Sequence, residues 1–125
     1  MNPTERDSEL VVELAKTFMS TLQQQFPGWS RAFFRFSATD LHYGSKGSVE
    51  RDGQVTLLSS IKLSEFFEHM NRTANELWER GAKFQVLLLT VQSDFDYRID
   101  FELADLGRWE ITKLNGASGL PVGLA

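Results

Sequence analysis

The segment "FQVLLLTVQSDFDYRIDFEL" (84–103) holds two neighbouring stretches with different side-chain patterns. The first is apolar at three consecutive positions, Leu87 to Leu89, which is typical of a central strand covered on both faces. In the second, Phe95, Tyr97, Ile99, Phe101 and Leu103 alternate with charged residues, which is typical of a strand with one buried face. The segment therefore predicts two consecutive strands, the first central and the second with one charged face.

Three further strands are predicted upstream of this segment. In "WSRAFFRFSA" (29–38), apolar and polar residues alternate through Ala32, Phe34 and Phe36, which indicates a strand. The stretch "SVERDGQVTLL" (48–58) predicts a hairpin, because Asp52-Gly53 suits a two-residue type I′ turn.

Two long helices are predicted from apolar residues at helical spacing. In the first, Asn2 is a candidate N-cap and Pro27-Gly28 ends the helix. The second begins near residues 60–64 and stops at Gly81. Its apolar positions are Leu63, Phe66, Phe67, Met70, Ala74, Leu77 and Trp78.

The element order α-β-β-β-α-β-β predicts a single α+β domain over residues 1–125. We expect a mainly antiparallel sheet of about five strands with both helices packed on one face. A short helix is expected in "DLGRWEITKLNG" (105–116), and the tail from Ala117 has no predicted place. The predicted core contains Leu14, Phe18, Leu22, Phe34, Phe36, Phe67, Met70, Leu77, Leu88, Ile99 and Phe101.

Composition and charge narrow the classes of function. Hydrophobic residues make up 42% of the 125-residue chain and the net charge is −4, which argues against binding to nucleic acid or an anionic membrane. The absence of cysteine excludes disulfides, thiolate metal sites and cysteine nucleophiles. No apolar run has the length of a membrane span, and the N-terminus lacks a signal-peptide pattern, so we expect a cytoplasmic protein.

Six carboxylates between Asp94 and Glu110 make this stretch the candidate site. A catalytic carboxylate pair would need one member with a pKa raised by apolar burial, but the neighbours on this strand face are charged. The spacing is not that of a calcium loop, and the histidines His42 and His69 have no second metal ligand at helical spacing. A solvated charged face and an acidic recognition surface both remain open. We predict no catalytic, cofactor-binding or metal-binding residues.

The candidate residues for binding a partner form two groups. Asp96, Asp100 and Glu102 share one strand face, with Asp94 and Asp105 at its ends. The loop "TDLHYGSKG" (39–47) supplies Asp40, His42 and Tyr43. By elimination, the sequence favours a binding protein over an enzyme.

Three segments resemble the YezG-like immunity proteins. "FPGWSRAFFRFSA" (26–38) resembles the turn and aromatic strand that follow their first helix, and "FFEHMNRTANELWERGAKFQVLLLTV" (66–91) resembles their second helix, glycine stop and next strand. "YRIDFELADL" (97–106) resembles their aromatic-x-Ile-Asp-Phe strand, with Leu103 departing from an aromatic position. Residues 39–63 match only in the hairpin and in length, so the resemblance covers about two-thirds of the chain.

The resemblance implies an immunity protein that neutralises a cognate toxin domain, with a basic nuclease expected, by stoichiometric binding. An acidic inhibitor suits such a partner because nucleases need basic surfaces for phosphates. The alternative is a type III secretion chaperone, an acidic dimer that holds an effector segment in apolar patches, here from Phe33, Leu87 and Leu89. We expect a monomer, no direct contact with nucleic acid or membrane, and no cofactor; an obligate dimer would favour the chaperone.

Overall fold

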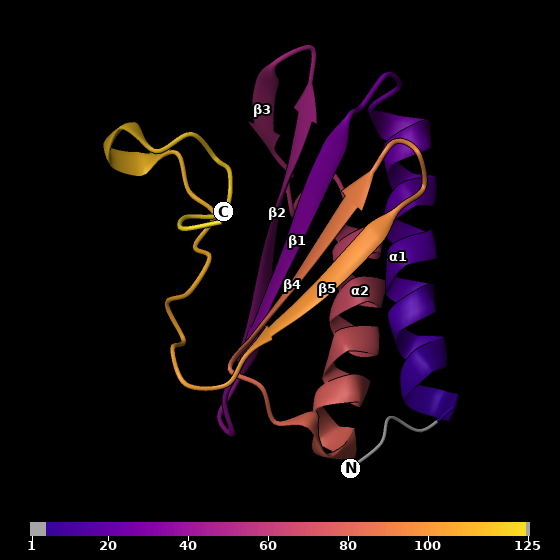
Figure 1. The fold of residues 1–125 in the computed structure, drawn as a ribbon, viewed down its shortest axis with the longest axis vertical. Coiled ribbons are helices and arrows are strands. Elements are labelled where there is room, and N and C mark those ends of the chain that lie inside the picture. The colour runs from indigo at the N-terminus through magenta and orange to yellow at the C-terminus, as the bar shows by residue number, and fades with distance from the viewer. Residues whose placement is uncertain (1–4, 125) are drawn as a thin grey trace.

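The computed structural model of the chain describes residues 5–124, so the predicted cap at Asn2 lies outside the described residues. The elements follow the predicted order (Figure 1): α1 (Glu5–Gln25), β1 (Arg31–Ala38), β2 (Tyr43–Arg51), β3 (Gln54–Leu57), α2 (Ser64–Leu77), β4 (Val86–Gln92) and β5 (Tyr97–Glu102). A π-helical turn, Trp78–Ala82, continues α2, and Gly81 within it has a φ of 109°, which interrupts the helical geometry. The α+β class is confirmed.

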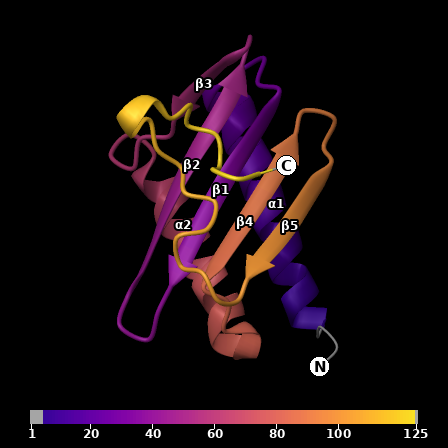
Figure 2. The same ribbon diagram turned by 60° about the vertical axis from the view of Figure 1, so that its left-hand side comes forward.

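The five strands form one antiparallel sheet in the order β3-β2-β1-β4-β5, with β1 in the centre. Both helices lie on one face, and the C-terminal segment after β5 crosses the opposite face (Figures 1 and 2). The predicted hairpin is present between β2 and β3. Asp52 and Gly53 both have positive φ, 53° and 77°, as a type I′ turn requires.

The larger core lies between the sheet and the two helices. Phe34 of β1 is fully buried, and its ring centroid lies 6.3 Å from those of Phe18, Phe66 and Phe67. Aromatic pairs at this separation add to the burial of apolar area. At the helix surface, Arg6 Nε donates to Glu76 Oε2 at 2.7 Å and links α1 to α2.

A second, smaller core lies on the other face of the sheet. Phe33, Val86 and Leu88 are buried there under Trp109 and Ile111 of the C-terminal segment. The three central leucines of β4 are therefore buried on both faces, as predicted, but an irregular segment supplies the second cover. The tail that the sequence left unplaced belongs to this layer, through Leu120 and Leu124.

The prediction that Ile99 and Phe101 of the last strand belong to the core is wrong. Phe101 is 42% exposed and Ile99 only partly buried, because β5 is an edge strand and the principal helix contacts are with β1, β2 and β4. The short helix expected within residues 105–116 is present as a 3-10 turn, Leu114–Gly116. Trp109 and Asn115 have left-handed φ values of 59° and 56°, which an α-helix does not tolerate.

Candidate partner-binding site

Five of the six carboxylates between Asp94 and Glu110 lie on β5 or close to one of its ends. Asp94 and Asp96 lie in the turn between β4 and β5, Asp100 lies within β5, and Glu102 and Asp105 lie where the chain leaves it. Asp100 and Glu102 pair with Leu88 and Val86 of β4, so they face the C-terminal segment and not the helices. Asp96 precedes the strand instead of belonging to it.

The turn between β4 and β5 is held by its own acidic side chains. Asp94 Oδ1 accepts the backbone N–H of Asp96, and Asp96 Oδ1 accepts the N–H of Tyr97, both at 3.0 Å. Phe95 between them has a left-handed φ of 68° and is 60% exposed. Asp94 and Asp96 are both exposed, so each carboxylate keeps an oxygen free for a partner.

Asp100 lies beside Arg98 on the same strand face. Its Oδ2 is 2.9 Å from Arg98 Nε, an ion-pair distance without hydrogen-bond geometry. The Asp100 side chain is 23% exposed and that of Arg98 is 70% exposed. In the middle of β5 the charges of Asp100 and Arg98 therefore cancel locally. Of these two charged side chains, Arg98 is the more exposed.

Glu102 is occupied by the loop that follows β5. Its Oε2 accepts the N–H groups of Ala104 and Asp105, at 3.0 and 3.2 Å, and its Oε1 accepts Arg108 Nη1 at 2.6 Å. The hydrogen bond from Ala104, followed by those from Arg108 and Asp105, lowers the pKa of Glu102 below its usual range. Asp105 Oδ1 in turn accepts the N–H of Gly107 at 2.9 Å. Glu102 thus caps the loop that follows β5. Asp105, by contrast, is exposed to solvent.

The second candidate group lies at the turn between β1 and β2, with Asp40 and His42 in the turn and Tyr43 at the first position of β2, so the loop expected over residues 39–47 is shorter than predicted. Thr39 Oγ1 accepts the backbone N–H groups of Leu41 and His42, at 3.2 and 3.3 Å, and fixes the turn. Asp40 and His42 are exposed, and the ring of Tyr43 packs 5.5 Å from that of Phe36 while remaining 46% exposed.

The register decides which candidates lie near each other. Ser37, next to this loop, pairs with Val86, which pairs with Glu102. The loop and the residues Glu102 and Asp105 therefore lie at one end of the sheet. Asp94 and Asp96 lie at the opposite end, beside the start of β1. The structure places seven of the eight candidates at the two ends of the sheet, with Asp94 and Asp96 at one end and Glu102, Asp105 and the loop residues at the other. Asp100 lies between them in the locally neutral middle of β5.

Two further features concern metal binding and the crossing of a membrane. Within residues 5–124, no group of three or more His, Asp or Glu side chains is placed to hold a metal ion. His69 Nε2 of α2 lies 3.8 Å from Glu13 Oε2 of α1. Across the same described residues, neither helix combines the length and apolar character needed to cross a membrane.

Sequence reasoning missed the anchoring of the C-terminal segment by Arg35 of β1. Arg35 Nε donates to the carbonyl of Arg108 at 2.8 Å, and its Nη2 donates to that of Leu106 at 2.6 Å. Burial lowers the pKa of this guanidinium, and the carboxylates of Glu110 and Asp105 oppose that shift. The available signal was an arginine in the middle of an otherwise buried aromatic strand, which requires acceptors from another segment.

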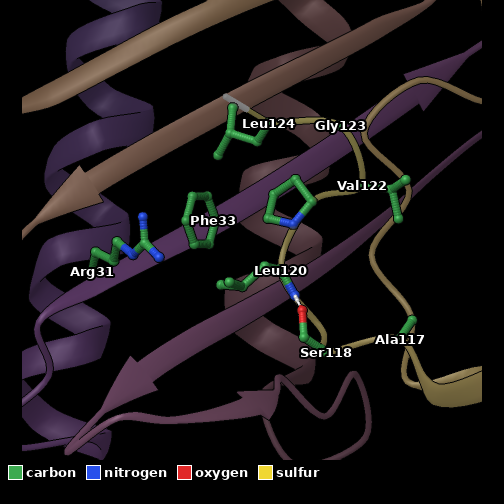
Figure 3. Close-up of a pocket in the computed structure, with 9 residues that line it drawn as sticks. Arg31, Phe33, Ala117, Ser118, Leu120, Val122, Gly123 and Leu124 are labelled. Carbon is green, nitrogen blue, oxygen red and sulfur yellow. Dashed lines mark hydrogen bonds between the residues drawn. The ribbon is translucent and has the colours of Figure 1, made fainter.

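The C-terminal segment also encloses an open cavity of about 370 Å³ against β1 (Figure 3). Phe33 forms its floor, Leu120 and Leu124 of the tail form its walls, and Arg31 lies at its rim. Arg31 Nε donates to Glu50 Oε1 at 2.9 Å, so the one charged group in the lining is already paired. The cavity adds apolar surface but no catalytic group.

Comparison with known proteins adds no relative to this picture. The chain matches no protein-family model and no curated protein. The fold and the site define a small α+β domain with acidic turns at both ends of the edge strand β5.

Proposed function

We propose that this chain is an immunity protein that neutralises a toxin domain with a basic surface, a nuclease domain being the expected partner, by one-to-one binding. The observation that supports this proposal is the pair of exposed acidic clusters at the two ends of β5, in a chain of net charge −4. Exposed carboxylates attract a basic partner during the diffusional encounter and suppress its contact with nucleic acid.

The contacts within the chain indicate which carboxylates serve the partner. Glu102 is held by Arg108 and two backbone N–H groups, and Asp100 lies against Arg98, so both already have partners. Asp94, Asp96, Asp105 and Asp40 are exposed, and the hydrogen bonds that their side chains make within residues 5–124 go to nearby backbone N–H groups. Asp105 also interacts electrostatically with Arg35. We assign the recognition of the toxin to these four aspartates, with His42 and Tyr43 beside Asp40.

Asparagine variants separate charge from structure, because asparagine retains the side-chain oxygen that accepts the turn N–H groups. One double variant, Asp94→Asn with Asp96→Asn, neutralises one end of β5. A second, Asp40→Asn with Asp105→Asn, neutralises the other end. Glu68→Asn with Glu65→Asn on α2 is the control, because both glutamates are exposed and lie away from β5.

The measurement is association with a candidate basic nuclease toxin domain, together with protection of cells that express that domain. The parent should bind one-to-one, with an association rate that falls as salt shortens the screening length to about 8 Å or less. One of the two aspartate doubles should slow association and flatten the salt dependence, while the control does neither. If the parent neither binds the domain nor protects cells, the immunity function is rejected; if both doubles bind like the parent, the aspartate assignment alone fails.

A secretion chaperone is the second candidate, and one observation favours it. Phe33, Leu87 and Leu89, from which its apolar patches were expected, are buried, so that part of the expectation is wrong. Exposed apolar side chains are found instead at Phe95, Tyr97, Phe101 and Leu103, along β5. A chaperone should protect an apolar effector segment from proteolysis in solution, whereas an immunity protein should not.

A further inference from the structure

The outer edge of β5 is open. β5 is the last strand of the sheet, and among residues 5–124 it pairs only with β4. Figure 2 shows it at the margin of the sheet with no further strand beside it. At the turn, the Gln92 N–H donates to the Asp96 carbonyl at 2.9 Å. Hydrogen bonding alternates along an antiparallel ladder, so Arg98 and Asp100 direct their backbone groups to β4. Those of Tyr97, Ile99 and Phe101 therefore point outward, where they form a template for another strand.

The side chains of this edge leave its helix-side face unprotected. Edge strands usually carry charged residues, above all lysine, or proline, or are covered, to prevent pairing with another chain. β5 contains no lysine or proline, and its charged residues lie on the face away from the helices. Four large apolar side chains on or beside it are 40–68% exposed: Phe95, Tyr97, Phe101 and Leu103. The Phe101 ring lies 5.1 Å from the ring of Phe84, so the apolar face of the edge continues directly from the core.

We propose that β5 pairs with β5 of a second copy of this chain, antiparallel and about a two-fold axis at Ile99. The two five-stranded sheets then form one ten-stranded sheet. On the helix side, Tyr97 of each copy lies opposite Phe101 of the other, and Phe95 lies opposite Leu103. On the other side, Arg98 of each copy lies opposite Asp100 of the other.

Charge complementarity selects this register over its neighbours. An axis at Arg98 would oppose two guanidinium groups, and an axis at Asp100 would oppose two carboxylates, both of which are unfavourable across a strand pair. The axis at Ile99 produces two opposite-charge pairs instead. It also brings a donor to Asp100 Oδ2, which is buried and accepts no hydrogen bond within its own chain.

Two symmetry-related like-charge pairs remain in this register, Asp96 of each copy opposite Glu102 of the other. Their repulsion is limited because Glu102 is already bound by Arg108 at 2.6 Å. A second copy therefore matches both faces of this edge strand, the apolar one by its aromatic residues and the charged one by its ion pairs. An unrelated basic partner would instead meet the exposed cation Arg98.

Each copy keeps its own closed core, so the dimer is reversible and concentration-dependent. Pairing residues 97–101 joins the copies over about 17 Å of strand, which is a small interface. The sequence favoured a monomer. The open edge of β5 is the observation that favours a reversible dimer instead. A reversible dimer does not decide between immunity protein and chaperone, because only an obligate dimer distinguishes them.

The test is the mass of the full chain in solution, measured by sedimentation equilibrium over a range of concentrations. The parent should move from 14.2 kDa toward twice that mass as concentration rises. Arg98→Asp and Asp100→Arg should each weaken the dimer about tenfold or more, because each opposes like charges across the axis. An equimolar mixture of the two variants should recover dimer, since all four charges across the axis are then complementary.

Arg72→Asp is the matched control, because Arg72 lies on α2 with a side chain that is 68% exposed. It should dimerise like the parent. Circular dichroism confirms that each variant is folded, and hydrogen exchange of the Ile99 amide should slow as the parent concentration rises. A parent that stays at 14.2 kDa up to about 1 mM overturns the proposal. So does a dimer that both single variants leave intact, or a mixture that fails to recover it.

Discussion

β1 and β5 have similar sequence patterns but differ in how deeply their side chains are buried. Each alternates aromatic or aliphatic residues with polar ones, through Phe34 and Phe36 in β1 and through Tyr97 and Phe101 in β5. In β1 the apolar side chains are fully buried, and in β5 the two aromatic ones are about 40% exposed. Position in the sheet makes the difference: β1 is central, with helices on one face and the C-terminal segment on the other, and β5 is at the edge.

The matched pair Phe34→Ala and Phe101→Ala tests this difference most directly. Phe34→Ala should lower the free energy of unfolding by about 3–5 kcal/mol, because it removes a fully buried ring. Phe101→Ala should lower it by about 1 kcal/mol or less, because that ring is already half in water. Urea denaturation of dilute protein measures both, and equal losses would contradict the contrast between centre and edge.

The second cover over β1 is tested at Trp109. This indole is 7% exposed against Phe33, Val86 and Leu88, so Trp109→Ala should cost about 3 kcal/mol of unfolding free energy. The change should also quench the near-ultraviolet signal of a packed tryptophan without altering helix content. A denaturation midpoint equal to that of the parent would show that the C-terminal segment does not seal this face.

Arg35 and Arg98 stand at comparable positions on the same face of the sheet, one central and one at the edge. Arg35→Ala removes two hydrogen bonds to carbonyls of the C-terminal segment and should cost about 1–2 kcal/mol. Arg98→Ala should change the unfolding free energy by about 0.5 kcal/mol at most, because Arg98 is largely exposed. The two denaturation midpoints decide the matter, and the reverse order would be inconsistent with the anchoring described.

The smallest effect is expected at Glu102, and it depends on pH. Backbone N–H groups and Arg108 lower its pKa in the folded chain, so its contribution is complete above the ordinary glutamate pKa, near 4.3. That contribution is lost as pH falls through the lowered value. Glu102→Gln should therefore be less stable than the parent at pH 7, and the gap should narrow by pH 3. A gap that is constant from pH 7 to pH 3 would argue against this role of the carboxylate.

Much of the fold could be predicted because local patterns and global packing agree. Asp52-Gly53 sets a type I′ turn by backbone preference alone, and the three consecutive leucines of β4 indicate burial on both faces. The acidic residues of the candidate site were visible as charges in the sequence, but Asp96 was expected on the strand face and precedes β5 instead.

The exposure of β5 and the packing of the chain after it could not be predicted in the same way. Alternation places Phe101 on the helix side, but only the arrangement of the whole sheet decides whether a helix reaches it. The C-terminal segment has no periodicity, because irregular backbone packs through single residues such as Trp109 and Ile111.

The sequence by itself determined the element order, the hairpin and the helix-side core, because these depend on periods and turn preferences within short windows. Only the tertiary structure decided that β5 is the open edge, that Arg35 holds the C-terminal segment, and that Glu102 caps a loop while Asp94 and Asp96 stay exposed. These outcomes depend on which distant segments share a face of the sheet, and burial and pairing, not local pattern, set the role of each charged side chain.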